Sequence, residues 1–135
     1  MASQSALINV MQKASIYASK GLLRDFGEVE NLQVSRKGPG DFVSRADINA
    51  EKTIRRELSK ARPDWGFQLE EGGVIEGADP DAPVWVVDPL DGTTNFLHGI
   101  PHFGISIAVM ETDPQGHRNI TCLLYTSDAA DDRLS

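Results

Sequence analysis

The stretch WVVDPLDGTTNFLHGIPHFGISIAV, residues 85–109, decides the fold of this 135-residue chain. Residues 84–87 form a continuous apolar run, which predicts a strand buried on both faces. Apolar side chains alternate over residues 103–110 and predict a second strand. The turn signal at residues 113–116 then predicts that a hairpin partner begins near Arg118. The region therefore favours a sheet of neighbouring strands.

The segments before this stretch predict helices that accompany the sheet. Residues 6–26 repeat apolar side chains at three- and four-residue steps, which predicts an amphipathic helix that stops at Gly27. A second helix is predicted over residues 46–61. Between the two helices, the turn signal Gly38-Pro39-Gly40 favours a hairpin of two short strands, residues 34–37 and 42–43. These elements together indicate a mixed α/β fold.

Composition limits the classes of function that the chain can have. A chain of 135 residues with 40% hydrophobic residues fits one globular domain, and a single cysteine excludes an intrachain disulfide. No apolar run approaches the roughly 20 residues of a membrane span, and no signal peptide is evident, so we expect a cytoplasmic protein without membrane contact. Between Arg62 and Arg118 there are ten carboxylates and no Lys or Arg. Such a segment would repel nucleic acid and attract a divalent cation, so direct nucleic-acid binding is not expected.

The turn that follows the first predicted strand carries the residues that could bind a ligand or take part in a reaction. Asp88 and Asp91 lie three residues apart at the strand end, where loops converge on ligands while the sheet stays rigid. Gly92 allows close approach of the backbone, and Thr93 and Thr94 add hydroxyl and N–H groups. The turn therefore offers carboxylates for a hard cation and donors for a phosphate.

Other interpretations of the same turn compete with a metal and phosphate site. The two carboxylates alone are equally compatible with capping of a turn or a helix. Haloacid-dehalogenase-type phosphatases carry D-x-D-G-T with one residue between the carboxylates, whereas Pro89 and Leu90 separate them here. The spacing of an EF-hand loop is also absent. His98 and His102 lie near the turn and are expected to have structural roles, and Glu71 is expected at the periphery of the site or on the surface.

With its upstream residues, this turn resembles the inositol monophosphatase family, in the superfamily that also includes fructose 1,6-bisphosphatase. The matching residues are Glu70-Glu71, residues 88–96 (DPLDGTTNF) and residues 99–101 with the strand after them. Lys37 and Asp47, in the segment KGPGDFVSRAD, match as well. The resemblance covers residues 1–121 and implies the truncated N-terminal half of a layered α/β/α/β/α domain.

The resemblance implies a site for Mg²⁺, with two or three ions when the site is complete. The first ion would be bound by Glu70, Asp88 and the backbone carbonyl of Leu90, and the second by Asp88 and Asp91. The implied catalytic residues are Glu70, Thr93, Asp47 and Lys37.

The family also implies a role in catalysis or binding for each of these residues. Thr93 and Glu70 would position and activate the attacking water, and Asp47 would accept a hydrogen bond from the Thr93 hydroxyl. The backbone N–H groups of Gly92 and Thr93 would hold the phosphate, and Asp91 is the further implied substrate-binding residue. Lys37 would lie near a third, weaker metal position.

The implied function is lithium-sensitive, magnesium-dependent hydrolysis of small phosphomonoesters by a metal-activated water. A phosphorylated polyol, inositol 1-phosphate, is the leading substrate because residues 94–96 (TNF) favour this branch of the family. Phosphatases of histidinol phosphate and of 3′-phosphoadenosine 5′-phosphate remain alternatives. Another alternative is a binding partner of the bacterial transcription machinery, which the acidic central segment does not support. A non-functional fragment is a third.

The chain departs from the family in its length and in its last residues. A full member is about twice as long, forms a homodimer, and supplies from its second half a W-D-x-x-A segment that completes the second metal site. We therefore expect weak metal binding and little turnover from these 135 residues alone. Residues 122–135 (CLLYTSDAADDRLS) resemble a translated sequencing adapter and are interpreted as a non-native tail. The alternative is a true strand over residues 122–125.

Overall fold

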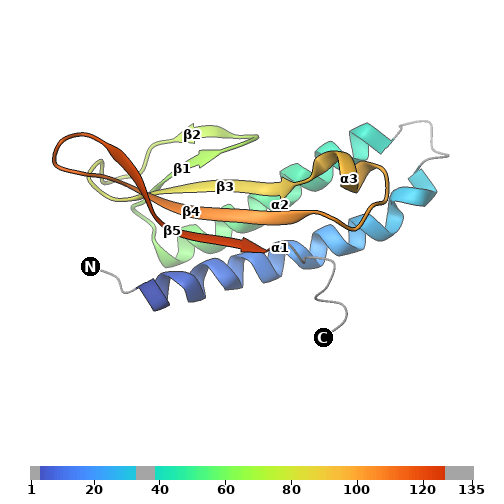
Figure 1. Ribbon diagram of the computed structural model, residues 1–135, viewed down its shortest axis with the longest axis horizontal. Coiled ribbons are helices and arrows are strands. Elements are labelled where there is room, and N and C mark those ends of the chain that lie inside the picture. The colour runs from blue at the N-terminus through green and yellow to red at the C-terminus, as the bar shows by residue number, and fades with distance from the viewer. Residues whose placement is uncertain (1–3, 33–38, 127–135) are drawn as a thin grey trace.

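The computed structural model describes residues 4–32 and 39–126. Figure 1 shows an α/β arrangement in which two long helices lie along a five-stranded sheet. In chain order, the elements are α1 (Gln4–Leu32), α2 (Pro39–Ala61), β1 (Gly66–Leu69), β2 (Gly73–Ile75), β3 (Val84–Asp91), α3 (Thr93–Leu97), β4 (Gly104–Thr112) and β5 (Arg118–Thr126). Among the described residues, no helix is both long enough and apolar enough to cross a lipid bilayer.

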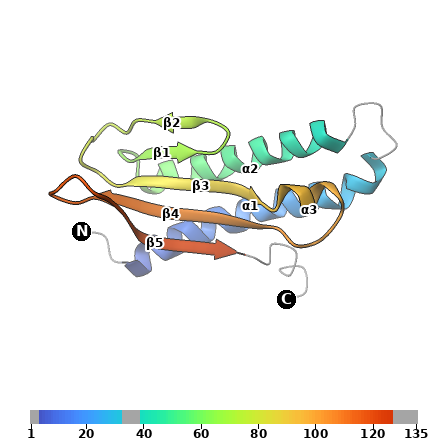
Figure 2. The ribbon, with the colours of Figure 1, turned by 45° about the horizontal axis from the view of Figure 1, so that its top comes forward.

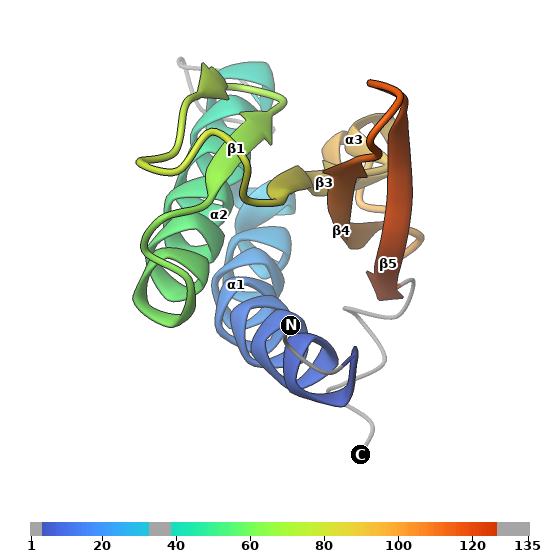
Figure 3. The ribbon, with the colours of Figure 1, turned by 90° about the vertical axis from the view of Figure 1, so that its left-hand side faces the viewer.

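The strands lie in the order β2-β1-β3-β4-β5 (Figure 2). β1 and β3 run parallel, and the other neighbouring pairs are antiparallel. The end-on view in Figure 3 shows α1 and α2 together on one side of the sheet. Between the helices and the sheet lies one continuous apolar core, to which α1 contributes Met11 and Leu22, α2 contributes Ile54, and β3 contributes Trp85.

α1 is longer than its apolar pattern predicts. The helix continues through Gly27 to Leu32, so the predicted stop at Gly27 is wrong. Phe26 contacts Phe96 and Phe103, with ring centroids 5.5 and 5.0 Å apart, and these contacts fix the helix against α3 and the start of β4. Tertiary packing therefore outweighs the low helix propensity of glycine at this point.

The predicted hairpin between the helices is also wrong in its second strand. Residues 42–43 lie inside α2, which begins at Pro39, and residues 34–37 lie outside the described residues. Proline suits the first position of a helix because its fixed φ and missing N–H cost nothing there. The turn signal at Pro39 marks a helix start, and the side chain of Val43 is buried in the core.

The strand predictions around residues 85–109 are confirmed, with one correction. β3 and β4 contain the predicted strands, and β5 begins at Arg118 as expected. Trp85 and Val87 are buried on the helix side, but Val84 and Val86 are only half-buried. Burial of β3 on both faces is therefore wrong for this chain, because the described helices cover one face of the sheet.

The last described residues belong to the sheet. Cys122 pairs with Val109 and Thr126 pairs with Ile105, so the structure continues β5 through residues 122–126. This agrees with the alternative of a strand over residues 122–125. The interpretation of residues 122–135 as a non-native tail stays a prediction.

Candidate functional site

The site begins where the two parallel strands β1 and β3 end side by side. Leu69 pairs with Val87 in the parallel register, so the next residues, Glu70 and Asp88, follow as neighbours. The contact is close enough that a hydrogen bond with Asp88, followed by burial and the Asp88 charge, raises the pKa of Glu70 to about 7. The register thus explains why carboxylates 18 residues apart in the sequence meet at one edge of the sheet.

α2 adds a buried carboxylate to this pair. Asp47 is 4% exposed, and its Oδ1 has no hydrogen-bond partner among the described residues. Burial, then the hydrogen bond and charge of Glu71, and then the charges of Glu70 and Asp88, raise the pKa of Asp47 to about 8. We call Asp47, Glu70, Glu71 and Asp88 the carboxylate cluster. Glu71 is exposed and contacts Asp47, which agrees with the expectation that it lies at the periphery of the site or on the surface.

A further carboxylate, which the sequence analysis missed, holds the turn between β1 and β2. Glu51 is 6% exposed and accepts hydrogen bonds from the backbone N–H groups of Glu71 and Gly72, at 3.0 and 2.9 Å. These bonds fix the segment that carries Glu70 and Glu71 against α2. The available signal was spacing, because Glu51 lies four residues after Asp47 and so on the same face of the helix.

The turn after β3 is ordered by its own hydrogen bonds. Asp88 Oδ1 accepts the backbone N–H of Leu90 at 3.3 Å, and the Thr93 hydroxyl donates to the Leu90 carbonyl at 3.1 Å. The expected hydrogen bond from Thr93 to Asp47 is not formed here, because the single hydroxyl proton is directed to Leu90. Leu90 and Thr93 nevertheless lie in the same turn as Asp88, the β3 member of the carboxylate cluster.

Gly92 joins β3 to α3 in a conformation that other residues rarely adopt. Its φ is 94° and its ψ is 36°, in the left-handed region. A Cβ at this position would lie 2.8 Å from the His102 carbonyl oxygen. Glycine is therefore required both for the turn angle and for the close approach of the chain before β4.

The remaining predicted residues lie around this centre or outside it. Asp91 accepts a hydrogen bond from the Tyr125 hydroxyl at 3.0 Å. The His98 ring contacts the Thr94 carbonyl through Nδ1 at 2.8 Å, a contact within α3 and its end. Lys37 lies outside the described residues.

The chemistry of the donor set suits a hard divalent cation. Carboxylates that raise each other's pKa, one of them with an unpartnered buried oxygen, hold negative charge that a cation would offset. Within the described part of the chain, no three His, Cys, Asp or Glu side chains already stand in an arrangement ready for a metal ion.

Comparison with known proteins gives the site its context. Residues 3–116 match the model of the inositol monophosphatase family. The chain is 64% identical over 107 residues to inositol-1-monophosphatase of Rhizobium meliloti, which covers 79% of this chain and 40% of that protein. It is 44% identical over 108 residues to Nus factor SuhB of Xylella fastidiosa, across 80% of this chain and 38% of that protein. The chain therefore spans about 40% of the length of such relatives.

Solved structures show the same architecture. Extragenic suppressor protein suhB from Bartonella henselae superimposes with a TM-score of 0.74 and 52% sequence identity, over 93% of this chain and 46% of that one. The inositol monophosphatase TM1415 of Thermotoga maritima superimposes with a TM-score of 0.68 and 27% identity. The matched segment contains the carboxylate cluster and the Gly92 turn. This chain belongs to the inositol monophosphatase family.

Proposed function

We propose that the complete protein hydrolyses small phosphomonoesters with Mg²⁺, and that inositol 1-phosphate is its leading substrate. The observation that carries this proposal is the carboxylate cluster, drawn from α2, β1 and β3 and placed beside the Gly92 turn. Relatives named inositol-1-monophosphatase support it. Because the chain covers about 40% of those relatives, the activity is proposed for the whole protein.

Magnesium would be held by the residues that combine carboxylate and carbonyl oxygens at the strand end. In the complete site, with two or three ions, these are Glu70, Asp88, Asp91 and the carbonyl of Leu90. When bound, magnesium supplies Lewis-acid activation of water and neutralises charge on the phosphate.

The other residues of the chain orient the reactants. Thr93 and Glu70 would position the attacking water, and Asp47 would support them from α2. The backbone N–H groups of Gly92 and Thr93 would hold the phosphate group, Asp91 would contact the substrate, and Lys37 would assist electrostatically. Attack of water on phosphorus breaks the ester P–O bond and releases the alcohol and phosphate, without a covalent enzyme intermediate. Most of the acceleration would come from positioning and from charge neutralisation.

The test compares this chain with the protein encoded by the whole gene. Phosphate release is measured from inositol 1-phosphate, histidinol phosphate and 3′-phosphoadenosine 5′-phosphate, with and without Mg²⁺ and Li⁺. We expect the whole protein to prefer inositol 1-phosphate, to require Mg²⁺ and to be inhibited by Li⁺. Little turnover is expected from the 135-residue chain alone. A preference for another of the three substrates would replace the substrate assignment and keep the reaction class.

A second candidate function is binding to the transcription machinery. The relatives named Nus factor SuhB, at 38–44% identity, favour it. Its test is a pull-down of purified RNA polymerase by the whole protein, with an Asp88→Asn variant that separates binding from hydrolysis. Homodimer formation and a cytoplasmic location of the whole protein remain predictions.

A further inference from the structure

Positive and negative side chains are segregated in this fold. Residues 1–62 contain 11 Lys and Arg against 7 Asp and Glu, a net charge of +4. Residues 63–135 contain 2 against 13, a net charge of −11. The helices α1 and α2 belong to the first part and all five strands to the second. α1 and α2 themselves carry 8 Lys and Arg against 7 Asp and Glu, and three of these carboxylates, Asp47, Glu51 and Glu57, are buried. The helical layer is therefore basic in its remaining charges although the chain as a whole is acidic.

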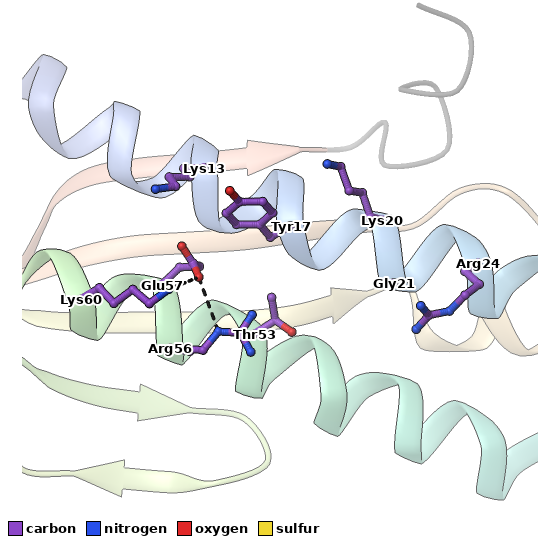
Figure 4. A pocket seen from close by; sticks show the side chains of 9 residues that line it. All are labelled: Lys13, Tyr17, Lys20, Gly21, Arg24, Thr53, Arg56, Glu57 and Lys60. Carbon is purple, nitrogen blue, oxygen red and sulfur yellow. Dashed lines mark hydrogen bonds and ion pairs between the residues drawn. The ribbon is translucent and has the colours of Figure 1, made fainter.

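A groove of about 470 Å³ lies on this basic layer, between α1 and α2. Figure 4 shows that both helices contribute to it. Tyr17 stands between two lysines, with the Nζ atoms of Lys13 and Lys20 5.9 and 5.5 Å from its ring centroid. The cationic side chains of this basic groove are Lys13, Lys20 and Arg24 from α1, and Arg56 and Lys60 from α2.

One carboxylate organises the α2 side of the basic groove. Glu57 is 7% exposed, and its Oε2 lies 3.2 Å from Lys60 Nζ and 3.5 Å from Arg56 Nε. Although burial raises the pKa of Glu57, the hydrogen bond and charge of Lys60, the hydrogen bond of Arg56 and the charge of Lys13 bring it below its ordinary value. On the α1 side, no described carboxylate lies within 4.0 Å of the Lys13 or Lys20 ammonium groups. Both ammonium groups can thus contact an external anion, and the charge of Lys13 also acts on Glu57.

We propose that the basic groove binds single-stranded nucleic acid through its phosphate backbone, on a surface separate from the carboxylate cluster. From Lys13 to Arg24 the cationic row extends roughly 16 Å along α1, at 1.5 Å per residue. Such a row can follow consecutive phosphates. Tyr17 is 43% exposed and offers a ring face on which a base can stack.

The exposed ring is what favours nucleic acid over an acidic peptide. An acidic peptide would satisfy the cations but would add no base to stack on Tyr17, whose described ring contacts are with Lys13 and Lys20. The expectation of no nucleic-acid binding rested on the acidic segment between Arg62 and Arg118, which forms mainly the sheet. The structure places that segment mainly in the sheet and the groove on the helices, so screening weakens its repulsion at the basic groove.

The first experiment measures fluorescence anisotropy of a labelled oligouridine of about 12 nucleotides with the 135-residue chain. The double variant Lys13→Glu/Lys20→Glu is compared with the matched control Lys52→Glu/Arg55→Glu. Both double variants have the same net charge, and the control changes two exposed residues of α2 that lie outside the groove. We expect at least a tenfold loss of affinity for the groove variant and less than a threefold loss for the control. The salt slope should shrink by about 1.4 for two lost phosphate contacts.

Equal losses in both double variants would show attraction by overall charge and would overturn the proposal. So would an affinity for oligoglutamate equal to or greater than that for oligouridine, or no binding at about 50 mM salt. Tyr17→Phe should retain affinity and Tyr17→Ala should lose it, because stacking needs the ring and not the hydroxyl.

A second measurement needs no variant and stands if a variant fails to fold. Lysine acetylation of the unmodified chain is mapped by mass spectrometry with and without oligouridine. Lys13, Lys20 and Lys60 should be protected, while Lys52 should not. Uniform protection, or protection of Lys52 alone, would overturn the assignment. Loss of phosphatase activity in the whole protein would leave these results unaffected, so the two proposals fail separately.

Discussion

The Glu51 carboxylate holds the backbone N–H of Gly72 at 2.9 Å, although the two residues are 21 positions apart in the sequence. The same carboxylate accepts the N–H of Glu71 at 3.0 Å, so a single α2 side chain fixes the segment that brings Glu70 and Glu71 to the carboxylate cluster. The arrangement predicts that Glu51 acts on the site by positioning this segment.

Glu51→Gln should destabilise the chain by about 0.5–1.5 kcal/mol, because the amide replaces one accepting oxygen by a donor and removes one of the two part-buried hydrogen bonds. Urea unfolding gives the change in free energy, and hydrogen exchange of the Gly72 amide reports the local bond. Glu28→Gln, on an exposed part of α1, is the control and should change stability little. Unchanged exchange at Gly72 would contradict the positioning role.

The raised pKa of Asp47 predicts a pH-dependent stability for the metal-free chain. The pKa rises from 3.8 to about 8 on folding, so the folded state binds the extra proton and the free energy of unfolding falls as pH increases between these values. In EDTA, Tm should fall by about 5 °C or more between pH 5 and pH 8. Asp47→Asn should flatten this dependence, whereas Asp81→Asn, in an exposed loop, should not. A parallel pH profile for both variants would refute the assignment to Asp47.

Magnesium should stabilise the folded chain by neutralising the carboxylate cluster. At about ten times its Kd the gain is about 1.4 kcal/mol, or roughly 4 °C in Tm. The gain should be larger at pH 8 than at pH 5, because protons compete with the metal for the same oxygens. Asp88→Asn should abolish it and Asp64→Asn should preserve it, with K⁺ at equal ionic strength as the reference. A gain that survives Asp88→Asn would place the ion elsewhere.

Replacement of glycine by alanine is predicted to have opposite effects on stability at two positions, Gly92 and Gly27. Gly92→Ala should destabilise by about 2 kcal/mol or more, because φ is 94° and the new Cβ would meet the His102 carbonyl at 2.8 Å. Gly27→Ala should stabilise by about 0.5–1 kcal/mol, since Gly27 lies inside α1 with open space around it. Urea midpoints of the two variants measure both signs. Similar shifts in one direction would contradict the conformational explanation.

The last residues give a prediction about the gene. We expect reads that span codon 121 to encode a sequence different from residues 122–135, continuing into a W-D-x-x-A segment. The check is resequencing of the genomic locus. A genomic match to all 14 residues would show that the tail is native and that β5 is built from the protein's own sequence.

The sequence predicts the two long central strands well, and it predicts helix boundaries and very short strands less well. β3 and β4 follow from long apolar patterns that few other structures satisfy. The start of α2 was missed because Gly38-Pro39-Gly40 signals a turn as readily as a helix start, and local residues alone do not decide between them. β2 has three residues, two of them exposed, and carries no periodic signal of its own.

The same distinction applies to the candidate site. The turn from Asp88 to Thr93 is local, so its residues were identified from one short motif. The role of Glu51 depends on pairing with a turn some 20 residues away, which only the packing of α2 against β1 reveals. The destination of the Thr93 hydroxyl proton likewise depends on the turn geometry and not on residue type.

The short length of β1 has a consequence for how long the carboxylate cluster persists in solution. β1 has four residues and its outer neighbour β2 has three, whereas β3 has eight and β4 nine. The β1 ladder is therefore expected to open by local fraying well before the β3–β4 pair separates. Each opening parts Glu70 from Asp88 while the rest of the molecule stays folded. A ligand that bridges these two carboxylates would hold the end of β1 against β3 and so oppose this opening.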